Sequence, residues 1–394
     1  MRARLDQQLK IQPTTVVFCS TCVVSNQRPR TSFDEAGVCS ACQYAYRKNH
    51  EIDWKTREEE LRALCDAHRS ADGSFDVVVP SSGGKDSGYT AHLLKVKYGM
   101  HPLCVTWAPF SYTDIGWKNF QDFVKAGFTV LSCFPNGALH RKLARVAFET
   151  KGDAWEPFTF GQKAYAFHIA LKWNIPLIFY GENGEVEYSG FMKNATKPYE
   201  SPKDWGELYF KGGGVDTLLQ VGVDMKVFTK EESKDKTFDL YKAPPLQDIE
   251  RLGVQMHWLS YYRKWIPQEN FYYAQKHTGF TVNEDGRSEG TYSKYTSLDD
   301  KFDGFHFYLG FIKFGLGRAS REAMMEIRSG HITREEGVAL VKRYDGEFPK
   351  KYFKEFLDYL AIDERHFWEV VDSYRPKHLW EKKGVEWKLK YQVS

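Results

Sequence analysis

A glycine-rich loop between a short apolar run and an amphipathic stretch constrains the fold of this chain more than any other feature. Residues 75–80 contain three consecutive valines and predict a buried strand. Residues 82–87 then read Ser-Gly-Gly-Lys-Asp-Ser, and residues 87–98 predict a helix. Glycines let backbone N–H groups approach an anion closely, and a helix N-terminus adds partial positive charge. The sequence therefore places a phosphate-binding device at a strand–helix junction.

The chain continues with alternating strand and helix patterns. Further strands are predicted at residues 101–107, 129–134 and 176–180. Helices are predicted at residues 54–68, 116–126, 138–149 and 160–173. Alternating units of this length predict an α/β fold, in which a parallel sheet carries helices on both faces. Ligands of such sheets bind at the carboxyl ends of the strands, where the strand order reverses.

Candidate ligand-binding residues stand at the ends of two predicted strands. Thr106 and Trp107 end one strand, while Gly181, Glu182 and Asn183 follow another. The carboxyl ends of parallel strands meet at one edge of a sheet, so we expect these residues to lie near the loop. Glu182 comes directly after an apolar run, and its carboxylate is the candidate acid or base.

Further charged residues offer candidates for the same site. Glu185 and Glu187 either extend a carboxylate cluster or lie on a solvated loop. Lys294, Asp299 and Arg318 stand near a predicted apolar helix. They either close the site over phosphates or belong to a capped, packed helix with surface charges.

Four of the seven cysteines form two C-x-x-C pairs, Cys19 with Cys22 and Cys39 with Cys42. Each pair brings two thiolates to one ion from a tight turn, and two pairs complete the tetrahedral shell of a zinc site. Four thiolates leave no open position, so the expected zinc is structural. A redox C-x-x-C and an iron–sulfur cluster are the alternatives.

The other cysteines and the overall charge bound the class of protein. Cys65, Cys104 and Cys133 show no pairing pattern, and we expect them to be core residues. The net charge of +3 gives no strong electrostatic case for nucleic-acid binding, and a solvated tail or a docking surface explains the basic residues 375–390 at least as well as RNA binding does. No signal-like region or membrane-length apolar run occurs, so we expect a cytoplasmic protein with reduced thiols.

The loop resembles the PP-loop motif S-G-G-x-D-S of the ATP pyrophosphatase superfamily, whose domain is adenine nucleotide α-hydrolase-like (HUP). The fixed positions of that motif are all matched, by Ser82, Gly83, Gly84, Asp86 and Ser87. The resemblance implies that the loop holds the pyrophosphate part of ATP while the α-phosphate is attacked. It also implies that Asp86 binds Mg²⁺ and that Lys85 adds positive charge.

Nearly the whole chain resembles the N-acetyl sugar amidotransferase family. The resemblance rests on the four cysteines, the loop, residues 179–185 (Phe-Tyr-Gly-Glu-Asn-Gly-Glu) and the aromatic C-terminal half. It implies that ATP adenylates the carbonyl oxygen of an acetamido group on a nucleotide-linked N-acetyl sugar, in bacterial O-antigen biosynthesis. Ammonia then displaces AMP and leaves an acetamidino group.

The resemblance and the strand ends together define the predicted site. The predicted catalytic residues are Lys85, Asp86, Glu182 and Lys294. The residues predicted to bind ATP are Ser81, Ser82, Gly83, Gly84, Lys85, Asp86, Ser87, Thr106, Trp107, Gly181 and Asn183.

The expected source of ammonia is a separate protein. Arg2 stands where an N-terminal-nucleophile glutaminase would carry cysteine, and no G-x-C-x-G elbow occurs. The family resemblance implies a glutaminase partner with a cyclase-like ammonia-channelling subunit, similar to those of histidine biosynthesis. A tRNA-thiolating enzyme and a non-catalytic nucleotide-binding scaffold are the alternative functions.

Three regions are predicted: a zinc ribbon at 1–50, a PP-loop domain at 51–245 and a mainly helical substrate or partner region at 246–394. Within them, residues 205–243 read as an insertion or lid. C-terminal helices are predicted at 257–265, 269–276, 305–317 and, as a helix–turn–helix, 321–342. Thr333 and Glu336 have the spacing of a capping box.

Overall fold

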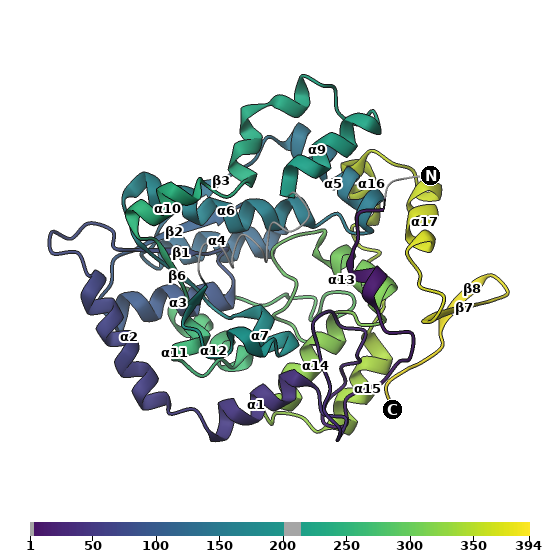
Figure 1. The fold of residues 1–394 in the computed structure, drawn as a ribbon, viewed down its shortest axis with the longest axis horizontal. Helices are drawn as coiled ribbons and strands as arrows, with labels where there is room; N and C mark the ends of the chain where they lie inside the picture. The colour runs from purple at the N-terminus through teal and green to yellow at the C-terminus, as the bar shows by residue number, and fades with distance from the viewer. Residues whose placement is uncertain (1–3, 201–213) are drawn as a thin grey trace.

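A six-stranded sheet organises the first half of the computed structural model, which describes residues 4–200 and 214–394 (Figure 1). The strands lie in the order β3-β2-β1-β4-β6-β5, and every neighbouring pair is parallel except β5 with β6. Their bounds are β1 Val77–Pro80, β2 Pro102–Trp107, β3 Thr129–Cys133, β4 Leu177–Tyr180, β5 Tyr199–Glu200 and β6 Gln255–Trp258. The predicted α/β fold with a mostly parallel sheet is confirmed.

The strand order reverses beside β1. The chain places β2 and β3 on one side of β1, and β4 and β6 on the other side. Val78 pairs with Leu103 of β2 and with Ile178 of β4, so β1 is flanked on both edges. A crevice forms at such a reversal, outside the carboxyl ends of the strands. The glycine-rich loop, which follows β1 directly, begins at this crevice.

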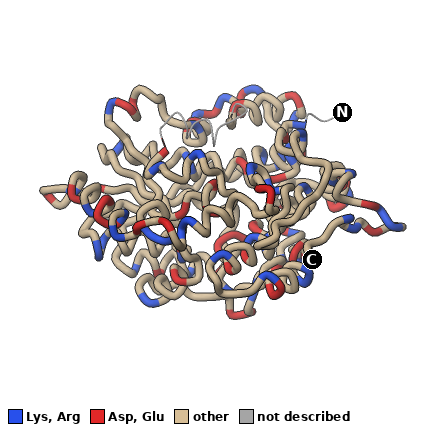
Figure 2. The backbone as a smooth tube through the Cα atoms, turned by 60° about the horizontal axis from the view of Figure 1, so that its bottom comes forward, with Lys and Arg blue, Asp and Glu red and all other residues tan. Residues whose placement is uncertain are grey.

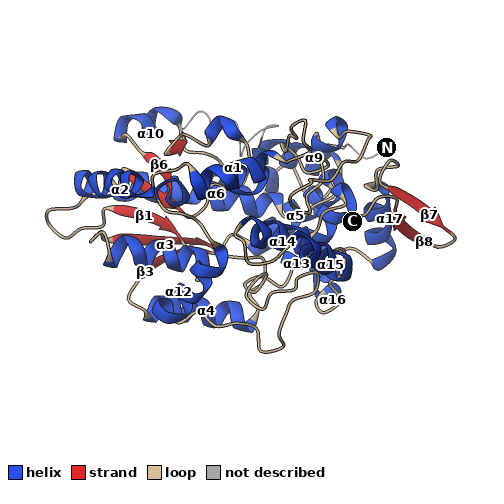
Figure 3. Ribbon diagram, turned by 90° about the horizontal axis from the view of Figure 1, so that it is seen from below, coloured by secondary structure: helices blue, strands red, loops and turns tan. Residues whose placement is uncertain are grey.

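Alternate residues of β1 pack into different cores because successive side chains of a strand point to opposite faces. Val77 and Val79 pack with Leu94 of α3 in one buried cluster. Val78 packs with Phe167 of α6 in another cluster. Helices therefore cover both faces of the sheet (Figure 3).

The helices of this half follow the predicted ranges closely, with additions that the sequence did not predict. The α-helices are α1 Ser40–His50, α2 Trp54–His68, α3 Lys85–Val96, α4 Asp114–Lys125, α5 Gly137–Lys151, α6 Glu156–Trp173, α7 Gly184–Ser189 and α9 Gly214–Asp224. The 3-10 helices are η1 Gln8–Ile11, η2 Met192–Asn194, η3 Glu232–Lys234 and η4 Lys236–Tyr241. Of the predicted insertion, residues 205–213 lie outside the described residues, and α9 and η4 pack against α5 and α6.

The C-terminal half is mainly helical and ends in a hairpin. Its helices are α10 Leu246–Leu252, α11 Leu259–Tyr262, α12 Pro267–Thr278, α13 Asp303–Phe314, α14 Arg318–Arg328, α15 Arg334–Tyr344, α16 Phe353–Leu360 and α17 Glu364–Ser373. The capping box at the start of α15 is confirmed, because Thr333 and Glu336 bond reciprocally. The basic C-terminal stretch contains the antiparallel pair β7 Trp380–Lys383 and β8 Glu386–Leu389, at the opposite end of the molecule from the sheet (Figure 3).

The helix predicted at residues 257–265 is confirmed only for Leu259–Tyr262, and its start is wrong. The chain enters the sheet there as β6, pairing Trp258 with Tyr180 of β4, before the short helix α11. Tertiary pairing with β4 decides this conformation, because periodicity cannot distinguish a short buried strand from a buried helix. The sheet thus extends past residue 245, where the sequence analysis divided the chain.

Charged residues of both signs are interspersed along the backbone (Figure 2). Within residues 4–200 and 214–394, no helix has both the length and the apolar character required to cross a membrane.

Candidate functional site

A cavity of about 410 Å³ opens at the strand-order reversal. The carboxyl ends of four parallel strands contribute to its lining, through Pro80, Trp107, Tyr180 and Trp258. Residues 81–87 of the glycine-rich loop line it as well. The cavity therefore occupies the position at which sheets of this topology bind ligands.

The loop turns tightly from β1 into α3 and requires glycine at one position. Gly83 has φ of +82°, and a Cβ there would lie 2.6 Å from the backbone Cα of Phe120 in α4. A side chain would thus be strained both by the left-handed conformation and by the neighbouring helix. Gly84 is the N-cap of α3, so the first N–H groups of that helix have no intrahelical acceptor. The helix start can donate these groups to an anion.

Two buried residues fix the base of the loop. The Ser81 N–H donates to the Val105 carbonyl at 2.8 Å, and the Thr106 hydroxyl donates to the Ser81 carbonyl. Trp107 packs on Gly161 of α6, where a Cβ would collide with the indole ring. Ser81, Thr106 and Trp107 therefore lie where the sequence places them, with side chains that hold the frame of the cavity.

Asp86 stands in the first turn of α3 and lines the cavity. Its Oδ1 accepts a hydrogen bond of 3.0 Å from Asn270 of α12, and its Oδ2 pairs with the Lys85 ammonium. The carboxylate is about one-third exposed, at 31%. Carboxylate oxygens that face a cavity in this way suit Mg²⁺. Asn270 carries no sequence signal and reaches Asp86 only through the packing of α12 on α3.

Glu182 lines the same cavity from the end of β4. Burial raises the pKa of its carboxyl group, and the nearby Asp86 carboxylate raises it further. Tyr188 of α7 donates a hydrogen bond of 3.0 Å to its Oε1. A carboxyl group with a raised pKa is suited to exchange a proton near neutral pH.

Lys163 is a cavity residue that the sequence analysis missed. It projects from α6 and lies 4.3 Å from the ring centre of Tyr180 and 5.4 Å from that of Trp258. Burial lowers the pKa of its ammonium group. A helix interior offers no local motif for such a residue, so only the tertiary structure reveals it.

The segment before α13 covers the loop. Asp299 lines the cavity, and burial raises the pKa of its carboxyl group, with Asp303 raising it further. A Cβ on Gly116 would lie 2.5 Å from the Asp299 Cα, so this segment is in close contact with α4. Arg318, the first residue of α14, also lines the cavity, with its guanidinium 4.2 Å from the centre of the Phe307 ring.

Lys294 does not lie among the residues that line the cavity. Its side chain is exposed, and its carbonyl accepts a hydrogen bond from the Asn283 N–H. The neighbouring Tyr295 turns inward instead, stacks on Phe271 and lines the cavity. The prediction of Lys294 as a catalytic residue is not supported, because this loop directs its side chain to solvent.

The residues that follow β4 do not all lie at the cavity, although the sequence predicts this for several of them. Gly181 lines the cavity, but Asn183 is buried outside its lining and caps α7 by accepting from the Glu185 N–H at 3.2 Å. Glu185 pairs with Arg30 at 2.6 Å, and Glu187 forms a buried ion pair with Lys48 at 2.7 Å. Neither glutamate lines the cavity, so they do not extend its carboxylate cluster.

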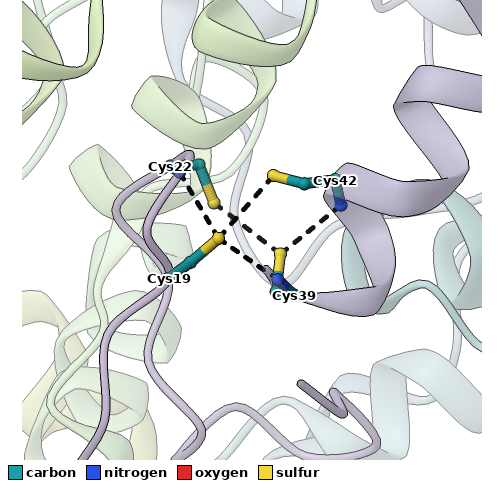
Figure 4. Close-up of side chains that lie close together, drawn as sticks. All are labelled: Cys19, Cys22, Cys39 and Cys42. Carbon is teal, nitrogen blue, oxygen red and sulfur yellow. Dashed lines mark hydrogen bonds between the residues drawn. The ribbon is translucent and has the colours of Figure 1, made fainter. Parts of the chain in front are cut away.

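The four N-terminal cysteines converge on one point (Figure 4). Their Sγ atoms all lie within 4.8 Å of one another, including 3.9 Å for Cys19–Cys42 and 3.8 Å for Cys22–Cys39. Tetrahedral zinc with bonds of about 2.3 Å to sulfur has sulfur–sulfur edges of about 3.8 Å. This buried group can therefore hold a structural zinc ion.

Backbone N–H groups point at these sulfurs, as expected around thiolates. The Cys39 N–H donates to Cys19 Sγ at 3.2 Å, and the Cys42 N–H donates to Cys39 Sγ at 3.4 Å. The unit packs against α14 and α15 in one apolar cluster that includes Met324 and Val338. The metal-binding unit thus shares a core with the C-terminal half.

Comparison with protein families identifies the C-terminal part of the chain. Residues 289–393 match the family model of the C-terminal domain of WbpG-like LPS biosynthesis proteins. This part of the chain is similar to the C-terminal domain of WbpG-like proteins. This match confirms the resemblance to enzymes of O-antigen and LPS biosynthesis, and it supports a role in surface-polysaccharide biosynthesis. No curated protein shows significant similarity to the chain.

The matched WbpG-like region contributes to the cavity. It contains Asp299 and Arg318, and also residues 295–298, which close the cavity beside the glycine-rich loop. The region that the family model matches is therefore continuous with the candidate site.

Proposed function

We propose that this chain is an ATP-dependent N-acetyl sugar amidotransferase of surface-polysaccharide biosynthesis. The observation that carries the proposal is the meeting of a glycine-rich anion-binding loop, two carboxylates and a WbpG-like cover in one cavity. The carboxylates are those of Asp86 and Glu182. The PP-loop resemblance, the sheet topology and the LPS-related C-terminal region support it together.

The loop and the cations act on the phosphates of ATP. The N–H groups at the start of α3 and the hydroxyls of Ser82 and Ser87 hold the β- and γ-phosphates. Asp86 would hold Mg²⁺, which would supply positive charge near the leaving pyrophosphate. Lys85 from α3 and Lys163 from α6 line the same cavity and supply further positive charge to it.

The reaction has two displacements. The acetamido oxygen attacks the α-phosphorus, and the bond from that phosphorus to the bridging oxygen breaks to release pyrophosphate. Ammonia then attacks the former carbonyl carbon, and the C–O bond breaks to release AMP and leave an amidine. Glu182 receives the proton that the attacking nitrogen loses, because it lines the cavity and burial raises the pKa of its carboxyl group above the ordinary value, which makes it a stronger base.

Ammonia reaches this site from a separate glutaminase with a channelling subunit in the proposed assembly. Glutamine should therefore support AMP formation only when such a glutaminase is added, whereas ammonium salts should support it without a partner.

The test incubates the protein with ATP, Mg²⁺, ammonium and nucleotide-linked N-acetyl sugars. We expect AMP and pyrophosphate to form only with the correct sugar, and the sugar mass to change by replacement of an oxygen with NH. AMP formation that depends on tRNA instead would establish the thiolation alternative. No cysteine is among the described residues that line the cavity, and burial raises the pKa of Cys104 and of Cys133 to about 12 and about 11. These observations disfavour a sulfur relay.

A further inference from the structure

The short helix α7 links the candidate site to the four-cysteine unit. It begins directly after Asn183, the residue that follows Glu182, and has only six residues. A helix of this length is not stable by itself, so tertiary contacts must fix its position. Tyr188, on α7, donates the hydrogen bond to Glu182. Movement of α7 would therefore move both Glu182 and its partner.

Helix α1, which begins inside the four-cysteine unit, holds one side of α7. Lys48 forms an ion pair of 2.7 Å with Glu187, and both side chains are almost fully buried, at 4% and 2% exposed. The Lys48 ammonium also donates to the Trp265 carbonyl at 3.1 Å. Loss of one partner from such a pair leaves a buried charge, which is strongly unfavourable.

The end of α7 rests on the first residues of α1. Ser40 Oγ donates to the Ser189 carbonyl at 2.8 Å. Gly190 approaches Ala41 so closely that a Cβ would collide with its backbone nitrogen. Because Cys39 is the N-cap of α1, the orientation of α1 depends directly on the four-cysteine site.

Arg328 joins the sulfurs to α7 directly. Its Nη2 lies 3.5 Å from Cys22 Sγ and 3.5 Å from Cys39 Sγ, and its Nε lies 3.5 Å from Cys42 Sγ. Its Nη1 donates to the Glu187 carbonyl at 3.2 Å. One buried guanidinium thus contacts three of the four thiol groups and the backbone of α7.

We propose that the four-cysteine unit, through Arg328 and α1, fixes α7 and thereby sets the position of Glu182 in the cavity. The metal site is then a positioning device for the reaction as well as a support for the fold. Its effect on turnover rests on the proposed function. Its effect on α7 can be measured without any activity.

The glycine-rich loop is held by a different set of contacts. Ser81 and Thr106 tie it to β2, and Asn270 of α12 contacts Asp86. Disturbing Arg328 should consequently lower kcat and leave the KM for ATP unchanged. A loss of folded protein would also lower the apparent kcat at constant KM, so kcat must be expressed per ATP-binding site rather than per total protein.

The decisive variant is Arg328→Lys, which keeps the buried charge but cannot span the sulfurs and the Glu187 carbonyl together. The matched control is Arg334→Lys, because the hydrogen bonds of Arg334 within the described part of the chain go to the carbonyls of Cys19 and Ser394 and not to α7. We expect Arg328→Lys to retain zinc and to lose about 10-fold in kcat, as for other groups next to a metal site. We expect Arg334→Lys to match the wild type.

Hydrogen exchange tests the coupling independently. Amides of residues 184–190 should exchange faster in Arg328→Lys, and in wild type treated with a chelator, while those of α3 stay protected. Restoring zinc to the chelated wild type should restore the protection of these amides. This experiment needs no variant, so it still tests the coupling if Arg328→Lys fails to fold. Unchanged exchange of α7 after complete zinc loss would overturn the proposal. A wild type that makes no AMP would overturn the proposed function, while the exchange result would still decide the coupling.

Discussion

The glycine-rich loop and the four-cysteine unit are both built from short motifs, but they present their polar groups in opposite ways. In the four-cysteine unit, backbone N–H groups and Arg328 point inward at sulfurs, and all four thiols are buried. In the loop, the N–H groups at the start of α3 face a cavity of about 410 Å³. The first arrangement is complete without a substrate, and the second requires one. This difference separates a structural site from a reactive one.

Among the changes that test this comparison of the loop with the four-cysteine unit, Asp86→Ala should have the largest effect. Loss of the carboxylate that holds Mg²⁺ should lower AMP formation at least about 100-fold, since metal stabilisation of developing charge is worth several kcal/mol. Zinc content, measured by atomic absorption, should not change. Asp66→Ala is the control, because Asp66 is exposed on α2, pairs with Arg69 and is not among the described residues that line the cavity. Full activity of Asp86→Ala would remove Asp86 from the mechanism.

Glu182→Gln should separate stability from activity. AMP formation should fall about 100-fold, the usual contribution of a general base. Burial raises the pKa of Glu182, and the neighbouring Asp86 carboxylate raises it further. The protonated group therefore stabilises the fold at acid pH, and this contribution is lost as the pH rises through the raised pKa.

The Gln variant should therefore gain thermal stability over wild type on going from about pH 5 to about pH 8, in zinc-loaded protein without Mg²⁺ or ATP. Thermal unfolding at several pH values measures this. An equal difference at every pH would show that Glu182 is not the titrating group.

Gly83→Ala should damage the loop without affecting the four-cysteine unit. The left-handed φ and the contact with Phe120 together cost about 1–3 kcal/mol of strain. This corresponds to roughly 10- to 100-fold weaker ATP binding if the loop is displaced. Gly137→Ala is the control, because nothing lies within 4 Å of a Cβ at that position and its φ is not positive. Calorimetric ATP affinity equal to wild type would show that the loop tolerates the change.

Removal of zinc should have the smallest effect on ATP binding. Chelation, or Cys22→Ala, should destabilise the protein by several kcal/mol because metal binding contributes folding free energy. ATP affinity should remain, as the loop belongs to β1 and α3. Cys65→Ala is the matched control, since Cys65 is buried in α2 and takes no part in the four-cysteine group. Loss of ATP binding together with zinc would show that the two sites are not separable.

Much of the fold was predictable because its signals are local. The three valines of β1, the glycines after them and the Thr333–Glu336 capping box each act within a few residues of chain. Two residues were missed because their helices show no sequence motif: Lys163 lines the cavity, and Asn270 donates a hydrogen bond to Asp86. Lys294 lies outside the cavity lining because the orientation of a loop side chain depends on what packs beside it, here Tyr295 on Phe271.

The sequence alone determined the strand–loop–helix junction, the four cysteines that can share one metal ion, and the alternation that builds a parallel sheet. These depend on backbone conformation and spacing, which neighbouring residues control. Only the tertiary structure decided that β6 joins the sheet, that Glu182 lies beside Asp86, and that Arg328 connects the cysteines to α7. Such contacts join residues far apart in the chain, and their geometry follows from packing of the whole molecule.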